Sequence, residues 1–387
     1  MAEWIECTLN DLGEIVGGAT PSTQREDYYG GDISWITPKD LSSLQGRYIS
    51  RGERNITKKG LASCSAQLMP PKTILFTSRA PIGYVAIAEQ TVCTNQGFKS
   101  IVPKAKVNPL FLYYLLVYNK EAIEAMGSGT TFKEVSGKAM RAVKVHIPSD
   151  MQSQIKIASL LDSIDSKIEA NAKLNDNLQQ QAQALFKSWF VDFEPVSNYG
   201  FIESPIGDIP CGWRIYTLSE FLPVITGKKN ANVSSDKGFY PFFSCSQDFS
   251  WTNEYSFEGH AILVAGNGDF NVKWYNGKFE AYQRTYVLIP YVERYTDWLY
   301  YAVKYNLESI TSAARGSVIK FITKGNLENF AFAAPGNLKK CEIIDTFSSI
   351  NRTIDNLTQE NYRLAEIRDS LLPKLMSGEI DVSAVQL

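Results

Sequence analysis

The residues best suited to metal binding or nucleophilic catalysis are few and scattered. Histidine occurs twice, as His146 and His260, in separate halves of the 387-residue chain. The six cysteines show no C-x-x-C spacing, so neither a zinc site nor a disulfide framework is indicated, and reduced thiols in a cytoplasmic protein are predicted. These cysteines are Cys7, Cys64, Cys93, Cys211, Cys245 and Cys341.

Motifs for nucleotide or cofactor chemistry are also missing from the sequence. It has no G-x-x-x-x-G-K-[ST] phosphate loop, and no recognisable carboxylate pair with a following lysine, as nucleases use to hold Mg²⁺. The nearest approach to an amino-methyltransferase motif is Asn108–Phe111, which resembles an Asn-Pro-Pro-Tyr/Phe loop. This run lacks the second proline, begins a predicted helix and follows no glycine-rich cofactor loop. The sequence therefore predicts no catalytic residue, no metal site and no cofactor bound by this chain.

The chain carries an internal repeat. A shift of 187 residues aligns 74–148 with 261–335 without a gap. Most columns of this alignment differ, so the matches mark what both halves keep. The matched pairs include Gln96 and Gln283, Pro103 and Pro290, Gly129 and Gly316, Lys133 and Lys320, Pro148 and Pro335, and the Leu-Tyr-Tyr runs at 112–114 and 299–301.

A long apolar heptad pattern follows each half of the repeat, and the two patterns align at a shift of 186 residues. No proline or glycine occurs between Gln152 and Asp192, and a periodic segment of ~35 residues exceeds the usual helix of roughly 8–20. The 3/4 apolar spacing over five heptads predicts a coiled-coil seam rather than two core helices of ordinary globular domains. The predicted seam residues are Ile157, Leu161, Ile164, Ile168, Asn175, Leu178, Leu185, Ile343, Phe347, Ile350, Ile354, Asn361, Leu364 and Leu371.

Two equivalent helices from a tandem repeat most simply pack about a pseudo-two-fold axis, which makes them antiparallel. Asn175 and Asn361 occupy the same position of the seam. They either set the register of the helices, at some cost in stability, or face solvent where the helices splay. The aromatic cluster of Phe186, Trp189 and Phe190 either caps the seam or anchors a partner protein.

A β-rich globule precedes each long helix. Strand-like runs at 73–76, 84–87, 261–264 and 286–289 are separated by Gly and Pro turns, and helices are predicted over 109–126 and 296–313. The predicted fold class is α+β: two β-rich domains with short helices, separated by two long helices that form an antiparallel coiled coil. The predicted boundaries are 1–149 and 213–335 for the domains, 150–193 and 336–376 for the long helices, 194–212 for a linker and 377–387 for a C-terminal tail.

Charge is distributed unevenly although the net charge is only −2. Residues 1–148 contain 17 Lys and Arg against 13 Asp and Glu, whereas 149–194 contain 4 against 7. This excess is weaker than in a strongly basic DNA-binding domain, so another subunit is expected to supply many phosphate contacts if DNA is bound. No stretch approaches 18 consecutive apolar residues and the N-terminus lacks signal-peptide features, which predicts a cytoplasmic protein that does not enter a membrane.

Several motifs resemble those of type I restriction-modification specificity subunits, in the family's order and over essentially the whole chain. In the first half they are Ile-Val-Gly-Gly-Ala-Thr-Pro-Ser-Thr at 15–23, and the runs 29–41, 78–83 and 94–98. Around the first long helix they are 129–136 and 185–193, and near the end Leu-Leu-Pro-Lys-Leu-Met-Ser-Gly-Glu-Ile at 371–380. The second half departs at 226–230, where Thr-Gly-Lys-Lys-Asn replaces the Gly-Gly-Ala-Thr-Pro-Ser run.

The resemblance implies a non-catalytic subunit with two target-recognition domains. Each domain would read one half of a bipartite, asymmetric site in double-stranded DNA, and the coiled coil would fix the gap between the halves. The implied partners are two modification subunits, which carry S-adenosylmethionine and methylate adenine, and restriction motor-nuclease subunits, which use ATP and Mg²⁺. The alternatives are a stand-alone DNA-binding regulator without enzymatic partners, and an enzyme whose unrecognised site includes Asn108.

The family motifs imply polar loops that contact DNA. Arg and Lys suit guanine, Asn and Gln suit adenine, and Ser, Thr and Lys position the protein on phosphate. Lys133 and Lys320 are expected on phosphate because both halves keep a cation there, whereas Asn267-Gly268 is also typical of a plain turn. The other candidates are Thr20, Ser22, Thr23, Lys39, Arg79, Asn95, Gln96, Lys99, Lys228, Lys229, Asn230, Ser244, Ser246, Gln247, Asn271, Gln283, Arg284 and Arg315.

Overall fold

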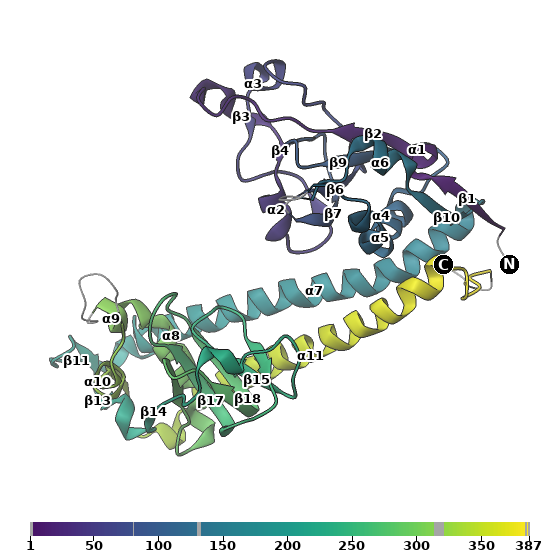
Figure 1. Cartoon of the computed structure of the whole chain (residues 1–387). Helices are drawn as coiled ribbons and strands as arrows, with labels where there is room; N and C mark the ends of the chain where they lie inside the picture. Colours follow the sequence, from purple (N-terminus) through teal and green to yellow (C-terminus); the bar gives the residue numbers. More distant parts are fainter. Residues whose placement is uncertain (1–2, 80, 130–132, 313–320, 384, 386–387) are drawn as a thin grey trace. The chain divides into compact units, whose positions relative to one another are not determined.

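The chain forms two compact units, shown by a computed structural model that describes residues 3–79, 81–129, 133–312, 321–383 and 385 (Figure 1). Unit 1 comprises Met1–Ala172 and Gln359–Leu387, and unit 2 comprises Lys173–Thr358. Each unit combines a β-rich domain with part of two long helices, which confirms the predicted α+β class. The predicted DNA contacts Arg315 and Lys320, the matched Gly316, and Ala80 and 130–132 of the family-like motifs lie outside the described residues.

Unit 1 is built on a five-stranded sheet in the order β2-β9-β6-β7-β5. All neighbours in this sheet are antiparallel except β5 and β7. The strands are β2 (Gly13–Gly17), β9 (Lys99–Pro103), β6 (Ile74–Ser78), β7 (Ile82–Ala88) and β5 (Tyr48–Ile49). Two further pairs are β1 (Trp4–Thr8) with β10 (Lys144–Pro148) and β4 (Trp35–Ile36) with β8 (Cys93–Thr94), and β3 spans Tyr29–Ile33.

The short helices of unit 1 are α1 (Leu9–Leu12), α2 (Pro38–Ser42), α3 (Lys58–Ala62), α4 (Pro109–Tyr118), α5 (Lys120–Ala125) and α6 (Gly137–Ala142). At the start of α4, Asn108 Oδ1 accepts a hydrogen bond from Phe111 N at 2.9 Å, and Pro109 occupies the first helical position. This is an ordinary helix N-cap, because proline at that position loses no helical hydrogen bond. The Asn108 run is thus used for capping.

Unit 2 repeats this plan with a six-stranded sheet in the order β14-β19-β17-β18-β15-β16. Its strands are β14 (Val224–Thr226), β19 (Thr285–Leu288), β17 (Phe257–Ala265), β18 (Val272–Ala281), β15 (Tyr240–Phe243) and β16 (Ser250–Thr252). The pairs β11 (Phe201–Ile202) with β12 (Ile209–Pro210) and β13 (Trp213–Thr217) with β20 (Ala331–Pro335) lie outside that sheet. Its short helices are α8 (Thr296–Tyr305), α9 (Leu307–Ser312) and α10 (Lys324–Glu328).

The repeat extends further than the gap-free alignment indicates. Trp4 pairs with Pro148 in unit 1, and Trp213 pairs with Pro335 in unit 2. Because Trp4 and Trp213 are 209 positions apart and the matched prolines 187 apart, unit 1 contains 22 more residues between its first strands and β6. The chain therefore keeps one scaffold in both units and inserts a longer segment in the first.

Each predicted helix over 109–126 and 296–313 divides in two. In unit 1 the break falls at Asn119, whose Nδ2 donates to Leu115 O at 2.8 Å. In unit 2 it falls at the equivalent Asn306, whose Nδ2 donates to Ala302 O at 2.9 Å. An asparagine amide that binds a backbone carbonyl competes with the helix, which explains why both breaks occur at matched asparagines.

The long helices are α7 (Met151–Phe190) and α11 (Ile343–Met376), drawn in teal and yellow in Figure 1. In unit 1, Arg368 contacts Asp165 and Asn361 contacts Asn171, so the numbers rise on one helix as they fall on the other. Unit 2 follows the same order. There Asn175 contacts Thr358, and Phe186 lies 6.3 Å from Phe347 between ring centroids. The helices are therefore antiparallel within each unit, as predicted.

The seam asparagines bond across the two helices. Asn171 Nδ2 donates to Asn361 Oδ1 at 2.9 Å, and Asn361 Nδ2 donates to Ile168 O at 3.2 Å. In unit 2, Asn175 Nδ2 donates to Thr358 Oγ1 at 3.2 Å. Polar pairs of this kind favour one register over shifted ones, so the geometry supports the register interpretation rather than exposure to solvent.

Burial along the seam is strongest where the helices cover the domains. Ile157 and Leu161 belong to the unit 1 core, and Phe347 belongs to the unit 2 core. Ile354 is also buried. The other seam residues are half-buried, namely Ile164, Ile168, Asn175, Leu178, Leu185, Ile343, Ile350, Asn361, Leu364 and Leu371.

The aromatic cluster at the end of α7 is part of the unit 2 core. Phe190 is 6% exposed and packs against Phe186, Trp213 and Trp298, while Trp189 is half-buried. The burial of Phe186 and Phe190 within this core favours a capping role for the cluster over an exposed partner anchor. The cluster closes the core where the seam ends, which is the alternative interpretation.

Candidate nucleic-acid interface

The predicted contacts of unit 1 gather at one end of its sheet because the strands that carry them are antiparallel. Gly17, the last residue of β2, pairs with Lys99, the first residue of β9. Ser78, the last residue of β6, donates its backbone N–H to Gly97 O at 2.7 Å. The loops that contain Thr20, Ser22, Thr23, Arg79, Asn95, Gln96 and Lys99 therefore leave the sheet at the same end.

A glycine allows two of these loops to touch, and the same device occurs in unit 2. A Cβ at Gly18 would overlap the backbone oxygens of Thr94 and Asn95. At the equivalent Gly227 it would overlap the oxygens of Ala281 and Tyr282, which are the matching residues. Only glycine permits this approach without displacing the backbone. Both units thus hold their first loop against the loop that carries the matched glutamine.

The residues after these glycines face the matched glutamines. In unit 1, the Thr20 hydroxyl hydrogen-bonds the Gln96 side chain. In unit 2, Gln283 N donates to Lys229 O at 2.9 Å. Gln96 and Gln283 are both exposed, so their amides can reach a ligand outside the protein.

The charges near the unit 1 loops form a small cluster. Lys99 Nζ lies 3.2 Å from Glu134 Oε1, and Arg79 Nη1 lies 3.8 Å from Glu134 Oε2. One carboxylate therefore faces two cations, which leaves a net positive charge for phosphate. Lys133 is exposed next to this cluster, and Lys39 is exposed but pairs with Glu53 at 2.7 Å.

Asn95 has a structural role that the sequence did not indicate. Its Oδ1 accepts a hydrogen bond from Gly97 N at 2.9 Å, which closes the turn before β9. Its side chain is half-buried, whereas Ser22 and Thr23 are exposed. The turn places Gln96 outward, so Gln96 is better placed than Asn95 to meet DNA.

The unit 2 loops present more cations. Lys228 and Arg284 are exposed, and the Arg284 guanidinium makes no hydrogen bond or ion pair within the described ranges. Lys229 Nζ lies 2.6 Å from Glu254 Oε2, and this hydrogen bond raises the pKa of Lys229 and lowers that of Glu254. The neighbouring Asn230 is exposed.

Further loops meet at the same end of the unit 2 sheet. Cys245 Sγ contacts Asn267 Oδ1 at 3.1 Å and Arg284 O at 3.5 Å, so the loops after β15, β17 and before β19 meet. Ser246 N donates to Ser244 Oγ at 3.2 Å, and Gln247 donates to Asp269. This brings Ser244, Ser246, Gln247, Asn267 and Arg284 together.

Asn271 is placed differently from the other candidates. It is 8% exposed, and its Nδ2 donates to Cys245 O at 3.0 Å and to Asp269 O at 2.7 Å. These bonds hold two loops together. The amide donors are therefore already used inside the protein.

Lys273 belongs to this region although sequence reasoning missed it. Its amine donates to Ser246 O and to Ser244 O, and burial lowers its pKa. Its position within β18 resembles an ordinary strand residue, and unit 1 has Ala86 at the matched position. A half-buried lysine that braces two loops is visible only once the strands are paired.

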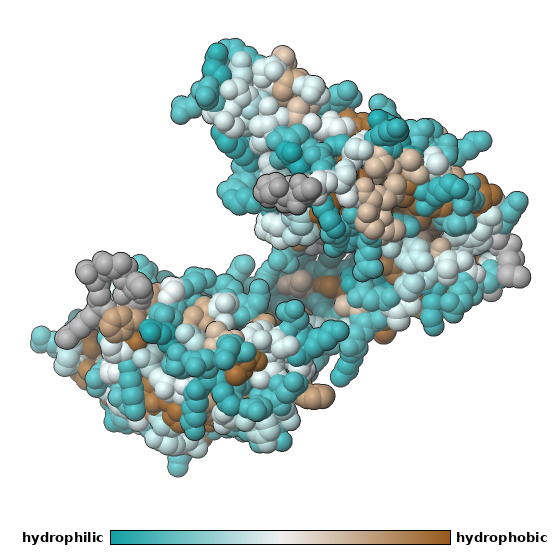
Figure 2. All heavy atoms as spheres, in the orientation of Figure 1, coloured by the Kyte–Doolittle hydropathy of each residue, from teal (hydrophilic) through white to brown (hydrophobic). Residues whose placement is uncertain are grey.

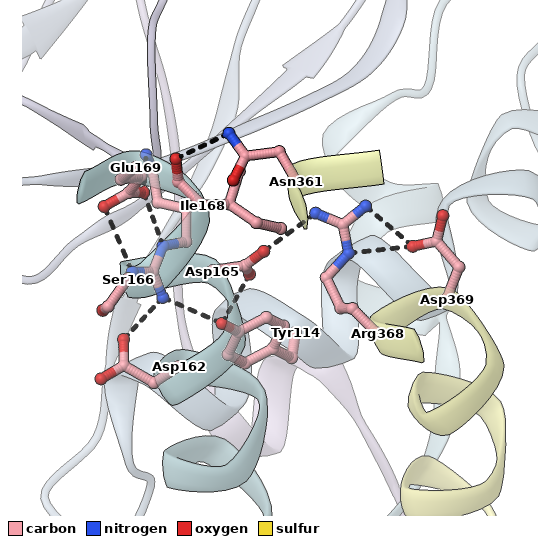
Figure 3. A network of polar contacts seen from close by, with 10 residues as sticks. Tyr114, Asp162, Asp165, Ser166, Ile168, Glu169, Asn361, Arg368 and Asp369 are labelled. Carbon is pink, nitrogen blue, oxygen red and sulfur yellow. Dashed lines mark hydrogen bonds and ion pairs between the residues drawn. The ribbon is translucent and has the colours of Figure 1, made fainter. Parts of the chain in front are cut away.

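A buried ion network attaches the unit 1 domain to α7 (Figure 3). Arg47 is 4% exposed, and its guanidinium donates to Asp162 Oδ1 at 2.6 Å, Glu169 Oε1 at 2.9 Å and Tyr114 Oη at 2.9 Å. Tyr114 in turn donates to Asp165 Oδ2 at 2.7 Å. The hydrogen bonds to Glu169 and Asp162 outweigh burial and raise the pKa of Arg47, so it remains charged.

The network continues to the second long helix. Arg368 of α11 donates to Asp165 Oδ1 at 2.9 Å and also pairs with Asp369. Figure 3 shows Asp165 between Tyr114 and Arg368, so one buried carboxylate connects α4, α7 and α11. This network fixes how the sheet and its loops are held on the helices of unit 1.

The described residues include neither a metal-binding cluster nor a helix that could span a membrane. No group of three or more His, Cys, Asp or Glu residues in the described part of the chain is arranged to hold a metal ion. Among the helices of the described residues, none is long and apolar enough to cross a bilayer. Figure 2 shows a mostly hydrophilic face on each unit, with small scattered apolar patches.

Comparisons with known proteins agree with this architecture. A family model described as the type I restriction modification DNA specificity domain matches residues 1–180 and again 210–366. The type I restriction enzyme MjaIX specificity subunit of Methanocaldococcus jannaschii is 33% identical, over 98% of this chain and 94% of the relative. The EcoDI specificity subunit of Escherichia coli is 37% identical over 45% of this chain and 40% of its own length. A crystal structure of the type I S subunit from M. genitalium has the same fold, with a TM-score of 0.62, 18% identity and coverage of 97% and 96%.

Proposed function

The chain belongs to the type I restriction-modification DNA specificity family, and we propose that it selects a bipartite, asymmetric DNA site, one half per domain. The observation that carries this proposal is that equivalent loops meet at the same end of the sheet in both units. Gly18 and Gly227 keep the same backbone approach, while the residues that follow them differ. One scaffold that presents two sets of side chains is what two unlike half-sites require.

The exposed side chains suggest how the halves differ. Arg284 occupies the position of Gly97, so unit 2 offers a guanidinium where unit 1 offers no side chain. Arginine binds guanine through two hydrogen bonds, and glutamine binds adenine in the same way. We assign Gln96 and Gln283 to base contacts in their respective halves, Arg284 to a guanine read by unit 2, and Lys133 and Lys228 to phosphate.

The proposed role of the long helices is to set the distance between the two DNA-recognition domains and to hold partner subunits. A helix of 40 residues such as α7 spans about 60 Å, which exceeds the about 34–36 Å of one DNA turn. The expected partners are two modification subunits, which carry S-adenosylmethionine, and restriction subunits, which use ATP and Mg²⁺. The chain itself contributes specificity and no catalytic group. The proposed domain limits remain 1–149 and 213–335.

Methylation mapping tests this function. The chain is expressed with the modification subunit encoded beside its gene, and methylated adenines are mapped across the host genome by single-molecule sequencing. The expected result is a split motif, with two short unlike halves around a fixed gap. If the complex forms with S-adenosylmethionine present and no new methylation appears, the chain acts instead as a stand-alone DNA-binding protein.

A further inference from the structure

We propose that a pocket in unit 2 binds an arginine side chain of a partner protein. The pocket has a volume of about 420 Å³ and lies between strands β17 and β18, the start of α8, and α11. The proposal rests on the proposed function in one respect, since the partner is taken to be the modification subunit. The repeat supports an arginine-binding pocket independently of that partner.

Unit 1 shows what the equivalent residues do. There, Glu169 of α7 and Tyr114 of α4 both accept hydrogen bonds from Arg47. The matched residues of unit 2 are Asp355, which lines the pocket, and Tyr301, which lies buried outside its lining. Asp355 lines the pocket and forms no hydrogen bond or ion pair among the residues described.

The longer segment of unit 1 explains why unit 2 has a pocket at this place. Arg47 lies in the stretch where unit 1 contains 22 more residues, and Arg47 O accepts a hydrogen bond from Ile87 N at 2.8 Å. The residue that matches Ile87 is Trp274, whose side chain lines the pocket. Unit 2 therefore keeps one carboxylate and the tyrosine of the arginine's acceptors, has Ser348 in place of Asp162, and lacks the segment that supplies the arginine.

The charges around the pocket favour a cation. Of its carboxylates, Asp345 is paired with Arg294 at 2.7 Å. The other carboxylates are Asp297, Asp355 and Glu293, and Glu293 Oε1 lies 3.9 Å from His260 Nδ1; Arg352 is the other arginine. Asp297 is 4% exposed and accepts from Asn351 Nδ2 at 2.7 Å, and His260 Nε2 lies 3.3 Å from Asp297 Oδ1. Three carboxylates repel a phosphate, so DNA is excluded as the occupant.

The arrangement of the acceptors favours arginine over lysine. Arg47 in unit 1 combines carboxylate contacts with a position over the Tyr48 ring, at 5.6 Å from its centroid. The unit 2 pocket offers the same combination with Trp274, whose ring packs edge-on against His260. A planar guanidinium satisfies separated acceptors and an aromatic face together, whereas an ammonium cannot.

Arg352 provides an internal check on this assignment. It matches Ser166, whose hydroxyl lies 3.0 Å from Arg47 Nη2 in unit 1. Arg352 places a positive charge at that point of the unit 2 pocket. Because like charges repel, Arg352→Ser is expected to strengthen the binding of an added guanidinium.

The first experiment uses the isolated full chain, labelled with ¹⁵N in its indole groups, and N-acetyl-L-argininamide as the probe. The Trp274 resonance is identified by its loss in Trp274→Phe. It is expected to shift saturably, with affinity about tenfold weaker in Asp355→Asn and stronger in Arg352→Ser. Asp176→Asn is the matched control, because Asp176 is an exposed carboxylate of α7 that does not line the pocket. A Trp274 signal that does not shift, or shifts equally in Asp355→Asn, overturns the site.

The second experiment measures assembly with the modification subunit. Asp355→Asn is expected to weaken assembly about tenfold, while Asp176→Asn does not. If argininamide binds in an Asp355-dependent way but assembly is unchanged, the partner assignment is overturned. If the wild-type chain fails to assemble at all, the proposed function is overturned, and the argininamide titration still decides whether the pocket binds a guanidinium.

Discussion

Equivalent tyrosines are attached to the long helices by charged groups in unit 1 and by mostly neutral groups in unit 2. Tyr114 donates to Asp165, which also accepts from Arg368. Tyr301 donates at 2.7 Å to Asn351, the residue that matches Asp165. The residue that matches Arg368 is Ala182, which is fully buried in the unit 2 core. A duplicated backbone has thus kept a hydrogen bond while its charge was removed.

The comparison of the two units shows which substitutions must occur together. A buried aspartate needs a cation, whereas an asparagine at the same position satisfies its neighbours without one. In unit 2, Asn351 both accepts from Tyr301 and donates to Asp297, so both ends of its amide are used. The Asp-with-Arg pair of unit 1, and the Asn-with-Ala pair of unit 2 together with Asp297, each satisfy the equivalent tyrosine. A mixture of the two arrangements is expected to be unstable.

The largest effect is expected from Arg47→Ala, which removes the cation of the unit 1 network. Glu169 and Asp162 then lose their buried partner, at a cost of about 3 kcal/mol in the unfolding free energy of unit 1. Denaturant titration of the full chain, followed by probes in each unit, measures this cost. Arg294→Ala is the matched control in unit 2, because the Arg294–Asp345 pair is more exposed and its loss is expected to cost less. Equal losses from both variants would contradict the importance of burial.

Arg368→Ala is expected to destabilise unit 1 by about 2 kcal/mol, because it leaves Asp165 buried without its cation. Adding Asp165→Asn removes the unpaired buried charge and is expected to recover part of that loss, because unit 1 has Leu110 where unit 2 has Asp297 to accept from the amide. A double-mutant cycle on unfolding free energies measures the coupling. Additive losses would mean that Asp165 and Arg368 do not act as a pair.

Arg284→Ala tests the difference between the two reading surfaces. It is expected to weaken binding about tenfold at one base pair of the unit 2 half-site and to relax specificity there, since a bidentate guanine contact is lost. Lys228→Ala, a nearby cation, is expected to weaken binding to all sequences and to reduce the salt dependence instead. Binding of the assembled complex to a panel of half-site variants separates the two outcomes. Unchanged specificity in Arg284→Ala would mean that Arg284 does not contact a base.

The smallest effect concerns Lys273, which has no counterpart in unit 1. Burial lowers its pKa in the folded protein, so the unfolded chain binds more protons at pH values between the folded pKa and the ordinary value of 10.5. Stability therefore rises with pH across that window. The difference between wild type and Lys273→Met isolates this contribution. A difference that falls as pH rises there would contradict the burial of the amine.

Much of the fold could be predicted from the sequence, because hydrophobic periodicity indicates secondary structure and the internal repeat indicates equivalent domains. The heptads predicted two antiparallel helices, and the matched columns predicted two domains of one kind. Sequence reasoning missed the breaks at Asn119 and Asn306, since a side-chain amide that caps a carbonyl leaves no trace in hydrophobic spacing. The aromatic cluster of Phe186 and Phe190 remained ambiguous because burial depends on the domain packed against it.

The site was only partly predictable, and the reason is sequence distance. Arg47 lies more than a hundred positions from Asp162 and Glu169, so nothing local marks it as a buried cation. In sequence Asn271 looks like a polar loop residue and Lys273 like an ordinary strand residue, yet both hold loops together from inside the protein. Gln96 and Gln283 were identifiable because the repeat keeps them while their surroundings change. Comparison of the two halves of the sequence thus identifies which positions both units keep. The side-chain contacts at those positions can be seen only when the paired strands are known.

Domain exchange tests most directly the claim that each unit reads its own half of the site. Residues 1–148 of the full chain are replaced with the first domain of another family member, and the chimera is mapped for adenine methylation with the same modification subunit. The account predicts one new half-site, with the other half and the gap unchanged. A change in both halves, or in neither, would contradict it.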